Sequence, residues 1–283
     1  MTSPSARLLR RVRGVARRLR GGPPPAPAAP PVEVPAPPAP PPERRFRLFG
    51  LGLAKSGTHS LAGVFASNYR SAHEPEAKAF VEVLNAVLSG EVERAELRRY
   101  LEEREERLDL EVNVAGWNGV AVPELVDLYP EARFVLTVRE PRSWLDSLLN
   151  HLEVGKAPPH FVRFRSLIYA DGGDHPPEEA VLAEHGFYPL RGYLLDYARR
   201  HELILDTVPA DRLLVLRTKE IGDRLDDLAA FVGVPADTLD RDQSHGFPAR
   251  AKFGFLDQIG DDHVQATIDE ICGPVMARLF PDG

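Results

Sequence analysis

The residues with the clearest chemical potential lie in one glycine-containing segment, Gly52-Leu-Ala-Lys-Ser-Gly-Thr-His-Ser60. An apolar run at residues 45–53 predicts a β-strand before it, and the spacing at residues 58–66 predicts a helix after it. A glycine turn between a strand and a helix directs successive backbone N–H groups at one point, and the helix dipole adds positive potential there. Lys55 adds a full charge, so the segment predicts a phosphate-binding loop.

This loop differs from the form used by nucleoside triphosphatases, G-x-x-x-x-G-K-[ST], in which the last hydroxyl holds magnesium. Lys55 stands two residues before the second glycine instead of directly after it. A later apolar run, residues 133–139, ends in Arg139 where a metal-holding acid would be required. The nine histidines show no H-x-x-x-H spacing. We therefore expect a ligand neutralised by lysine and arginine, and we expect no metal.

The elements around the loop alternate between strands and helices. Predicted strands cover residues 45–53, 133–139 and 212–217, and predicted helices cover residues 58–66, 76–107 with a break at Ser89-Gly90, 141–152 and 222–232. Strands this apolar suit a parallel sheet that is buried on both faces. The expected fold is α/β, a three-layer α/β/α sandwich with a central, mainly parallel sheet. Ligands bind at the carboxyl ends of such strands.

The first part of the chain has a different composition. Residues 1–22 carry seven arginines and no acid, and residues 23–43 form a linker that holds 12 of the 27 prolines. In a helix, the arginines of residues 7–20 would lie opposite an aliphatic face, which predicts peripheral contact with a membrane; the alternative is a solvated, disordered leader. We assign residues 44–283 to the folded domain, and within it we expect residues 153–189, rich in His and Pro, to form an irregular lid or substrate loop.

Lys55-Ser-Gly-Thr after a strand, with Arg139 and Ser147 eight residues apart, resembles the sulfotransferases that use 3′-phosphoadenylyl sulfate (PAPS). The resemblance covers most of residues 46–235 and implies a fold like that of the P-loop nucleoside-triphosphate hydrolases. It implies that Arg139 and Ser147 bind the 3′-phosphate of PAPS. It also implies that the 5′-phosphosulfate is bound by the loop residues Lys55, Ser56, Gly57, Thr58, His59 and Ser60.

The catalytic base is expected in the segment Ala72-His-Glu-Pro-Glu76, which we read as the end of a further strand that follows the helix of residues 58–66. Glu74-Pro75 resembles the Glu-Pro of carbohydrate-type members, in which the glutamate takes the proton of the acceptor hydroxyl. Partial burial would raise the pKa of Glu74 toward the working range. Aryl-type members use a histidine, so His73 and His151 are alternatives. A further alternative is that the two glutamates only cap the following helix.

Weaker candidates lie later in the chain. Arg250 and Lys252 occupy the place of a basic loop that often adds a 3′-phosphate contact in this family, although the sequence here lacks the fuller Arg-Lys-Gly form. Trp117 and Asn118 precede a predicted helix, where an indole and an amide suit acceptor binding.

The resemblance implies an enzyme that transfers a sulfuryl group from PAPS, by in-line displacement, to a hydroxyl of a sugar or of another small alcohol or lipid. Two alternatives stay open: an atypical nucleotide-dependent phosphotransferase, and an inactive nucleotide-binding scaffold at a membrane surface. The acidic folded domain and its lack of basic–aromatic runs argue against nucleic acid as a partner. The single cysteine, Cys272, and the absence of a signal sequence or a long apolar run predict a cytoplasmic protein.

Overall fold

A computed structural model describes residues 43–245 and 252–281 of the chain. The predicted basic arm, residues 1–22, and nearly all of the proline-rich linker lie outside the described residues. Residues 43–281 belong to one compact unit. Within the described ranges, no helix combines the length and the apolar character needed to cross a membrane.

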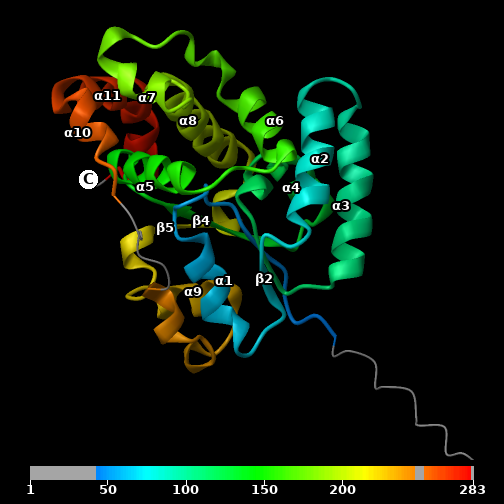
Figure 1. Ribbon diagram of the computed structural model, residues 1–283. Helices are drawn as coiled ribbons and strands as arrows, with labels where there is room; N and C mark the ends of the chain where they lie inside the picture. Colours follow the sequence, from blue (N-terminus) through cyan, green and yellow to red (C-terminus); the bar gives the residue numbers. More distant parts are fainter. Residues whose placement is uncertain (1–42, 246–251, 282–283) are drawn as a thin grey trace, which may run out of the picture. The chain divides into compact units, whose positions relative to one another are not determined.

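Five parallel strands form a single sheet in the order β2-β3-β1-β4-β5 (Figure 1). The strands are β1 (Leu48–Gly50), β2 (Ser71–His73), β3 (Val112–Val114), β4 (Arg133–Val138) and β5 (Leu213–Arg217). The main helices are α1 (Thr58–Ala66), α2 (Ala77–Leu88), α3 (Arg94–Leu108), α4 (Val122–Leu128), α5 (Pro141–Val154), α6 (Pro159–Ile168), α7 (Ala180–Glu184), α8 (Leu190–Thr207), α9 (Leu225–Val232), α10 (Phe255–Ile259) and α11 (Asp261–Leu279).

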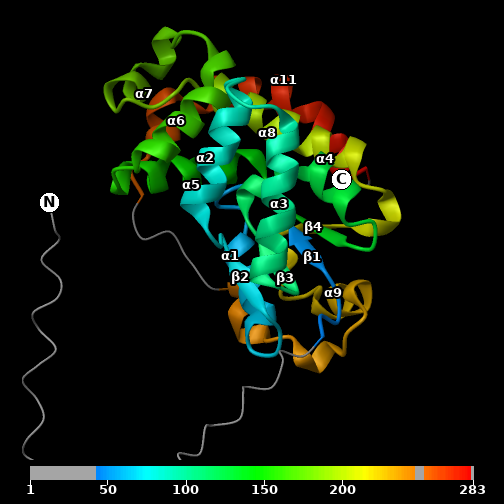
Figure 2. The same ribbon diagram turned by 90° about the vertical axis from the view of Figure 1, so that its right-hand side faces the viewer.

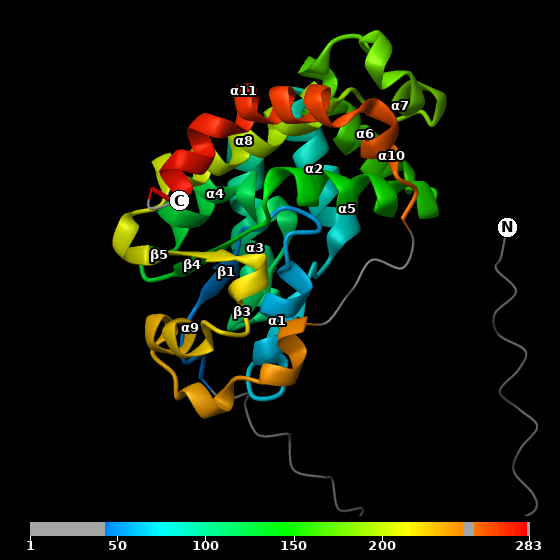
Figure 3. The same ribbon diagram turned by 90° about the vertical axis from the view of Figure 1, so that its left-hand side faces the viewer.

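The pleat of the sheet sends alternate side chains into two separate cores. Leu48 and Val135 pack with α1 and α9 on one face, whereas Phe49 and Phe134 pack with α4, α5, α8 and α11 on the other. Figure 3 shows α1 and α9 on one side of the strands and α8 and α11 on the opposite side. The three-layer α/β/α sandwich and its parallel sheet are therefore as predicted.

The strand–helix alternation places the chemically active segments at one edge of the sheet. The phosphate-loop segment follows β1, residues 74–76 follow β2, and Arg139 follows β4, which is hydrogen-bonded to β1. Because all strands are parallel, these three segments share the carboxyl edge. Figure 2 shows α2 and α3, which follow the second of these segments, running side by side against the sheet.

The expectation of an irregular loop over residues 153–189 is wrong. This segment contains α6 and α7, and Pro159 and Pro177 are first residues of helical turns. A proline at that position gives up an N–H that would have no partner in the helix, so it starts a helix there instead of breaking one. The strand β3 and the helices α8 and α11 carry no predicted element in the sequence analysis.

At the opposite edge of the sheet, where the strands begin, a buried carboxylate links three segments of the chain. Glu111 accepts hydrogen bonds from Arg45 Nε (2.6 Å), Arg45 Nη2 (2.8 Å) and the backbone N–H of Arg70 (3.0 Å). Burial alone would raise the pKa of Glu111, but these hydrogen bonds outweigh it and lower the pKa to about 2. The carboxylate therefore ties the segments that lead into β1, β2 and β3.

We expect Glu111→Gln to lower the free energy of unfolding by about 2 kcal/mol at pH 7. The folded-state pKa of about 2 lies below the ordinary 4.5, so the stabilisation is full above about pH 5 and is lost as pH falls toward 2. Urea unfolding at pH 7 and pH 3 checks this, with Glu131→Gln, which removes a surface ion pair to Arg47, as the control. Equal effects of the two substitutions would contradict the role of Glu111.

Candidate active site

The loop after β1 is held by side chains from three other parts of the chain. Four successive carbonyl oxygen atoms of the loop each accept a side-chain hydrogen bond: Leu53 from Ser56 Oγ (2.7 Å), Ala54 from Trp144 Nε1 (2.9 Å), Lys55 from Arg139 Nη1 (3.3 Å) and Ser56 from Thr218 Oγ1 (2.6 Å). Carbonyl groups that are tied to the surrounding protein cannot face a ligand. The arrangement therefore leaves the centre of the loop to N–H groups, which attract an anion.

Two residues of the loop adopt left-handed backbone conformations, which turn its carbonyl groups toward the protein. Lys55 has φ 70° and Gly57 has φ 95°, both in the left-handed region. A left-handed lysine costs on the order of 1 kcal/mol and persists only where the surroundings impose it. The helix α1 begins next, at Thr58, with no side chain capping its first turn. The positive end of that helix therefore opens onto the same point as the loop.

Two cations meet at this point, although Asp146 and Glu140 are close enough to stabilise part of the charge of Arg139. Neither Lys55 nor Arg139 forms an ion pair with any residue of the described ranges. Burial and the charge of Arg139 lower the pKa of Lys55, and burial lowers the pKa of Arg139. Both shifts show positive charge that is poorly compensated, which is the environment an anionic ligand would relieve.

Of the other loop residues predicted to bind the ligand, four line a cavity and one does not. Gly57, Thr58, His59 and Ser60 line a cavity of about 770 Å³ together with Lys55. Ser56 is 1% exposed, and its hydroxyl is bonded to Leu53 O and to Thr137 Oγ1 (3.1 Å). Its side chain holds the loop to β4 and does not face the cavity, and its backbone N–H donates to Leu53 O at 3.1 Å, so Ser56 shapes the loop.

The structure does not bring Ser147 to this cavity. Arg139 lines it and donates a hydrogen bond to Ser143 Oγ at 2.9 Å, and Ser143 also lines it. Ser147 lies one turn further along α5 and is buried, with 4% of its surface exposed. The helix starts at Pro141 with Glu140 accepting from the N–H groups of its first turn, which presents Ser143 to the cavity.

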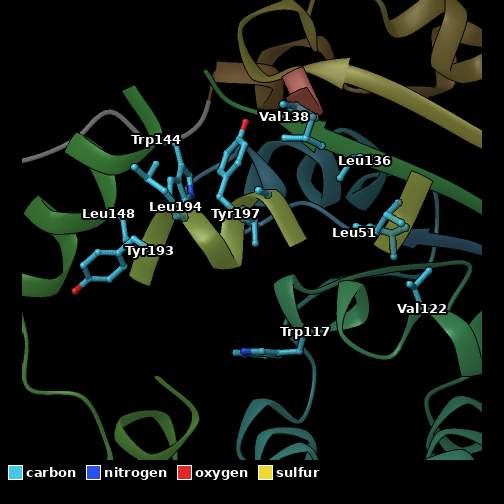
Figure 4. Close-up of a cluster of buried hydrophobic side chains, with 14 of the residues drawn as sticks. Leu51, Trp117, Val122, Leu136, Val138, Trp144, Leu148, Tyr193, Leu194 and Tyr197 are labelled. Atoms are coloured by element: carbon cyan, nitrogen blue, oxygen red, sulfur yellow. The ribbon is translucent and has the colours of Figure 1, made fainter. Parts of the chain in front are cut away.

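The backbone of Arg139 is fixed by an aromatic pair. Tyr197 Oη donates to the carbonyl oxygen of Arg139 at 2.8 Å, and the ring of Tyr197 lies 5.0 Å from that of Trp144. Figure 4 shows these two side chains next to each other, Trp144 from α5 and Tyr197 from α8. One aromatic pair therefore holds the loop through Ala54 and the arginine through its own carbonyl.

Glu74 stands at the end of β2 in a strained but well supported conformation. It has φ 52°, and its N–H donates to Val114 O at 2.7 Å. The fully buried Arg104 donates to the carbonyl oxygen of Pro75 at 2.9 Å and pairs with Glu105 at 2.8 Å. Burial raises the pKa of Glu74.

Glu74 lines two cavities at once. The first is the 770 Å³ cavity of Lys55, and the second is a cavity of about 340 Å³ lined mainly by aromatic and apolar side chains. Ala54, Glu74 and His151 line both cavities. The carboxyl group therefore lies where a group bound in one cavity would meet a group bound in the other.

The histidines near the loop are in different environments. His73 stacks on His59 with ring centroids 3.7 Å apart, and its Nε2 lies 3.0 Å from Thr58 Oγ1. Burial and the neighbouring His59 lower the pKa of His73 to about 4, so it is neutral at pH 7. Desolvation and the charges of Lys55 and Arg165 lower the pKa of His151.

The remaining candidates are placed as follows. Arg250 lies outside the described residues, and Lys252 is exposed and is not among the residues that line either cavity. Trp117 lines the smaller cavity, whereas Asn118 is buried and donates to Gly50 O and Asn113 O, a structural role. Arg217, Thr218 and Lys219, which the sequence analysis did not identify as site residues, line the larger cavity. Their place at the carboxyl end of a predicted strand is the signal that could have found them. No cluster of three metal-ligating side chains occurs in the described ranges.

We expect Gly52→Ala to damage the loop. A Cβ at this position would lie 1.9 Å from Thr137 Oγ1 and 2.9 Å from the carbonyl oxygen of Thr137. The clash should lower the free energy of unfolding by about 1–3 kcal/mol and weaken phosphate binding. Thermal unfolding with and without inorganic phosphate measures both effects. Gly273→Ala, where nothing lies within 4 Å, is the control and should be neutral or slightly stabilising; a Gly52→Ala protein as stable as that control would refute the close approach.

Comparison with known proteins identifies the family. A family model described as a sulfotransferase domain matches residues 47–249. No curated protein matches the chain. The crystal structure of a sulfotransferase from Alicyclobacillus acidocaldarius aligns over 82% of this chain and 96% of its own, with 18% sequence identity and a TM-score of 0.46. Because the family model spans well over half of the sequence, the protein belongs to the sulfotransferase domain family and is an enzyme that transfers sulfuryl groups.

Proposed function

We propose that the enzyme transfers the sulfuryl group of PAPS to an acceptor hydroxyl, with the nucleotide in the 770 Å³ cavity and the acceptor in the 340 Å³ cavity. The observation that carries this proposal is the pair of desolvated cations, Lys55 and Arg139, at the uncapped start of α1. The larger cavity has a volume typical of ligand sites, roughly 300–1,000 Å³. Arg217 and Lys219 add two further cations to its lining.

The residues present fit the two ends of such a nucleotide. The loop of residues 54–58, with Lys55, would hold the 5′-phosphosulfate, because its N–H groups and the start of α1 converge there. Arg139 would hold the 3′-phosphate with its planar guanidinium, and Ser143 takes the place beside it that the sequence resemblance gives to Ser147. The residue directly after β4 is Arg139, and the next residue, Glu140, accepts hydrogen bonds from the backbone N–H groups of Arg142 and Ser143 at the start of α5.

In the reaction, the acceptor oxygen attacks sulfur as the bond between sulfur and the bridging phosphate oxygen breaks. The electron pair of that bond goes to the bridging oxygen, where Lys55 and the N–H groups of the loop stabilise the new charge. Glu74, at the junction of the cavities, accepts the proton of the hydroxyl. The products are a sulfate ester and adenosine 3′,5′-bisphosphate.

Glu74 is favoured as the base over His73 by its surroundings. The ring nitrogen of His73 is bonded to Thr58, and the low pKa of about 4 makes His73 a weak proton acceptor. The raised pKa of Glu74 makes its carboxylate a stronger acceptor while it is ionised. His151 lines both cavities and is the alternative base.

Lys55→Ala should lower turnover by on the order of 10²–10³, as does the loss of one oxyanion donor. The transfer of labelled sulfate from PAPS, at saturating donor, measures this. Lys78→Ala, which removes an exposed lysine of α2, is the matched control and should behave as wild type. Turnover in Lys55→Ala equal to that of the control would show that Lys55 does not act on the leaving group.

Nucleotide selectivity can be measured without an acceptor. Adenosine 3′,5′-bisphosphate at 100 times its dissociation constant should add about 2.7 kcal/mol, or roughly 5–10 °C in Tm. Arg139→Gln should lose most of this shift, and Arg142→Gln, on the surface of α5, should retain it. A shift produced only by ATP with magnesium would contradict the proposal and favour a phosphotransferase. Binding of the bisphosphate with no transfer to any acceptor would favour an inactive scaffold.

The pH profile tests the base. Activity requires ionised Glu74, so kcat should fall as pH decreases through a pKa that lies above the ordinary value for glutamate. Glu74→Gln should remove this limb together with most of the activity, whereas His151→Gln should keep both. The reverse pattern, with the limb lost only in His151→Gln, would assign the proton transfer to His151.

A further inference from the structure

The smaller cavity has walls that favour a flat apolar molecule. Trp117 and Phe161 stack with ring centroids 5.5 Å apart and an interplanar angle of 28°. Phe164, Tyr169 and Leu148 complete the apolar lining. Aromatic walls of this kind bind a ring through its faces and edges and exclude water from it.

The lining offers few free hydrogen-bonding side chains to the several hydroxyl groups of a sugar. No Ser, Thr, Asn or Gln occurs among the described residues that line this cavity. Asp196 and Arg200 are present, but they bond to each other at 2.5 Å and 2.7 Å. The lining therefore offers a sugar few partners, contrary to the acceptor that the Glu-Pro resemblance suggested.

Of the cations that line this cavity, Lys156 is exposed to solvent and Arg165 is partly buried among the aromatic side chains. Arg165 lies on the same face of α6 as Phe161, Phe164 and Ile168, and all four line the cavity. Its guanidinium forms no ion pair within residues 43–245 and 252–281. By contrast Arg163, on the outer side of the same helix, pairs with Glu91 and contacts Ser89.

We propose that the acceptor is a ring-bearing hydroxy acid, with its hydroxyl at Glu74, its apolar ring against Trp117 and Phe161, and its carboxylate on Arg165. This inference rests on the proposed function, because it assigns the second substrate of that reaction. A planar guanidinium on an apolar wall binds a carboxylate through two parallel hydrogen bonds. The hydroxyl oxygen forms the new bond to sulfur as the bond between sulfur and the bridging phosphate oxygen of PAPS breaks and adenosine 3′,5′-bisphosphate leaves. The hydroxyl proton passes to Glu74, and the carboxylate stays unchanged.

The test compares acids with their neutral esters. The probes are 4-hydroxybenzoate, 4-hydroxyphenylacetate and 3-(4-hydroxyphenyl)propanoate, their methyl esters, and glucose. With PAPS as donor, at least one acid should exceed its ester about tenfold or more in kcat/KM and should exceed glucose. Titration of the same acid and ester into enzyme saturated with adenosine 3′,5′-bisphosphate should show the same preference in Kd, independently of turnover.

Two variants test whether Arg165 causes the preference for the acid over its ester. Arg165→Gln should reduce the acid-over-ester ratio about tenfold, through a loss of kcat/KM for the acid. Arg163→Gln, two residues away on the same helix, should keep the wild-type ratio. An acid no better than its ester in wild type, a ratio unaffected by Arg165→Gln, or a preference for glucose would overturn the inference.

Failure of this inference can be told from failure of the proposed function. If adenosine 3′,5′-bisphosphate binds in an Arg139-dependent manner but none of the acids binds or reacts better than its ester, only the acceptor assignment is wrong. If the bisphosphate does not bind, the nucleotide site and the acceptor assignment fail together.

Discussion

The site depends on how the carbonyl groups of residues 53–56 are satisfied. A loop that presents N–H groups to an anion must turn its carbonyl oxygens toward the protein, where each needs a donor. Here the donors outside the loop come from Trp144, Arg139 and Thr218, which belong to segments that follow β4 and β5. The anion site therefore exists only when the sheet has assembled, and the same contacts carry Arg139 to the loop.

The second half of the site is built by a buried ionic network. Arg104 and Glu105 are almost fully buried in α3, and they bond to Pro75 O and to the side chain of Asn113 in β3. Removing either charge would leave the other without a partner in the core. The network fixes the turn after β2, which brings Glu74 to the boundary between the two cavities. The loop around Lys55 and the turn that carries Glu74 are thus held by separate parts of the core.

Elements were predicted correctly from the sequence where the residues that define them lie within one short segment. The loop around Lys55, the strand that leads to Arg139 and the helix after Pro141 were all predicted with nearly correct bounds. β3 was missed because it has three residues and a polar Asn113 at its centre, whose side-chain N–H donates to Glu105 of α3, a residue outside the strand.

Which side chains line the cavities could not be predicted, because it depends on contacts between segments far apart in the sequence. Ser143 and Ser147 are one turn apart on α5, and only the docking of that helix through Glu140 and Trp144 presents Ser143 to the cavity. The smaller cavity arises where α6 and α8 meet the turn after β3, and no single segment of the sequence contains that arrangement. For this reason the sequence suggested a sugar or another alcohol as the acceptor, whereas the acceptor that we propose, a ring-bearing hydroxy acid, rests on the lining of the assembled cavity.

The most direct test of this account is a crystal structure of the enzyme with adenosine 3′,5′-bisphosphate. We expect the 5′-phosphate within hydrogen-bonding distance of Lys55 Nζ and of N–H groups of residues 54–58, and the 3′-phosphate on Arg139. The four carbonyl bonds of residues 53–56 should be unchanged. A nucleotide bound elsewhere, or a loop whose carbonyl oxygens turn toward the phosphate, would contradict the account.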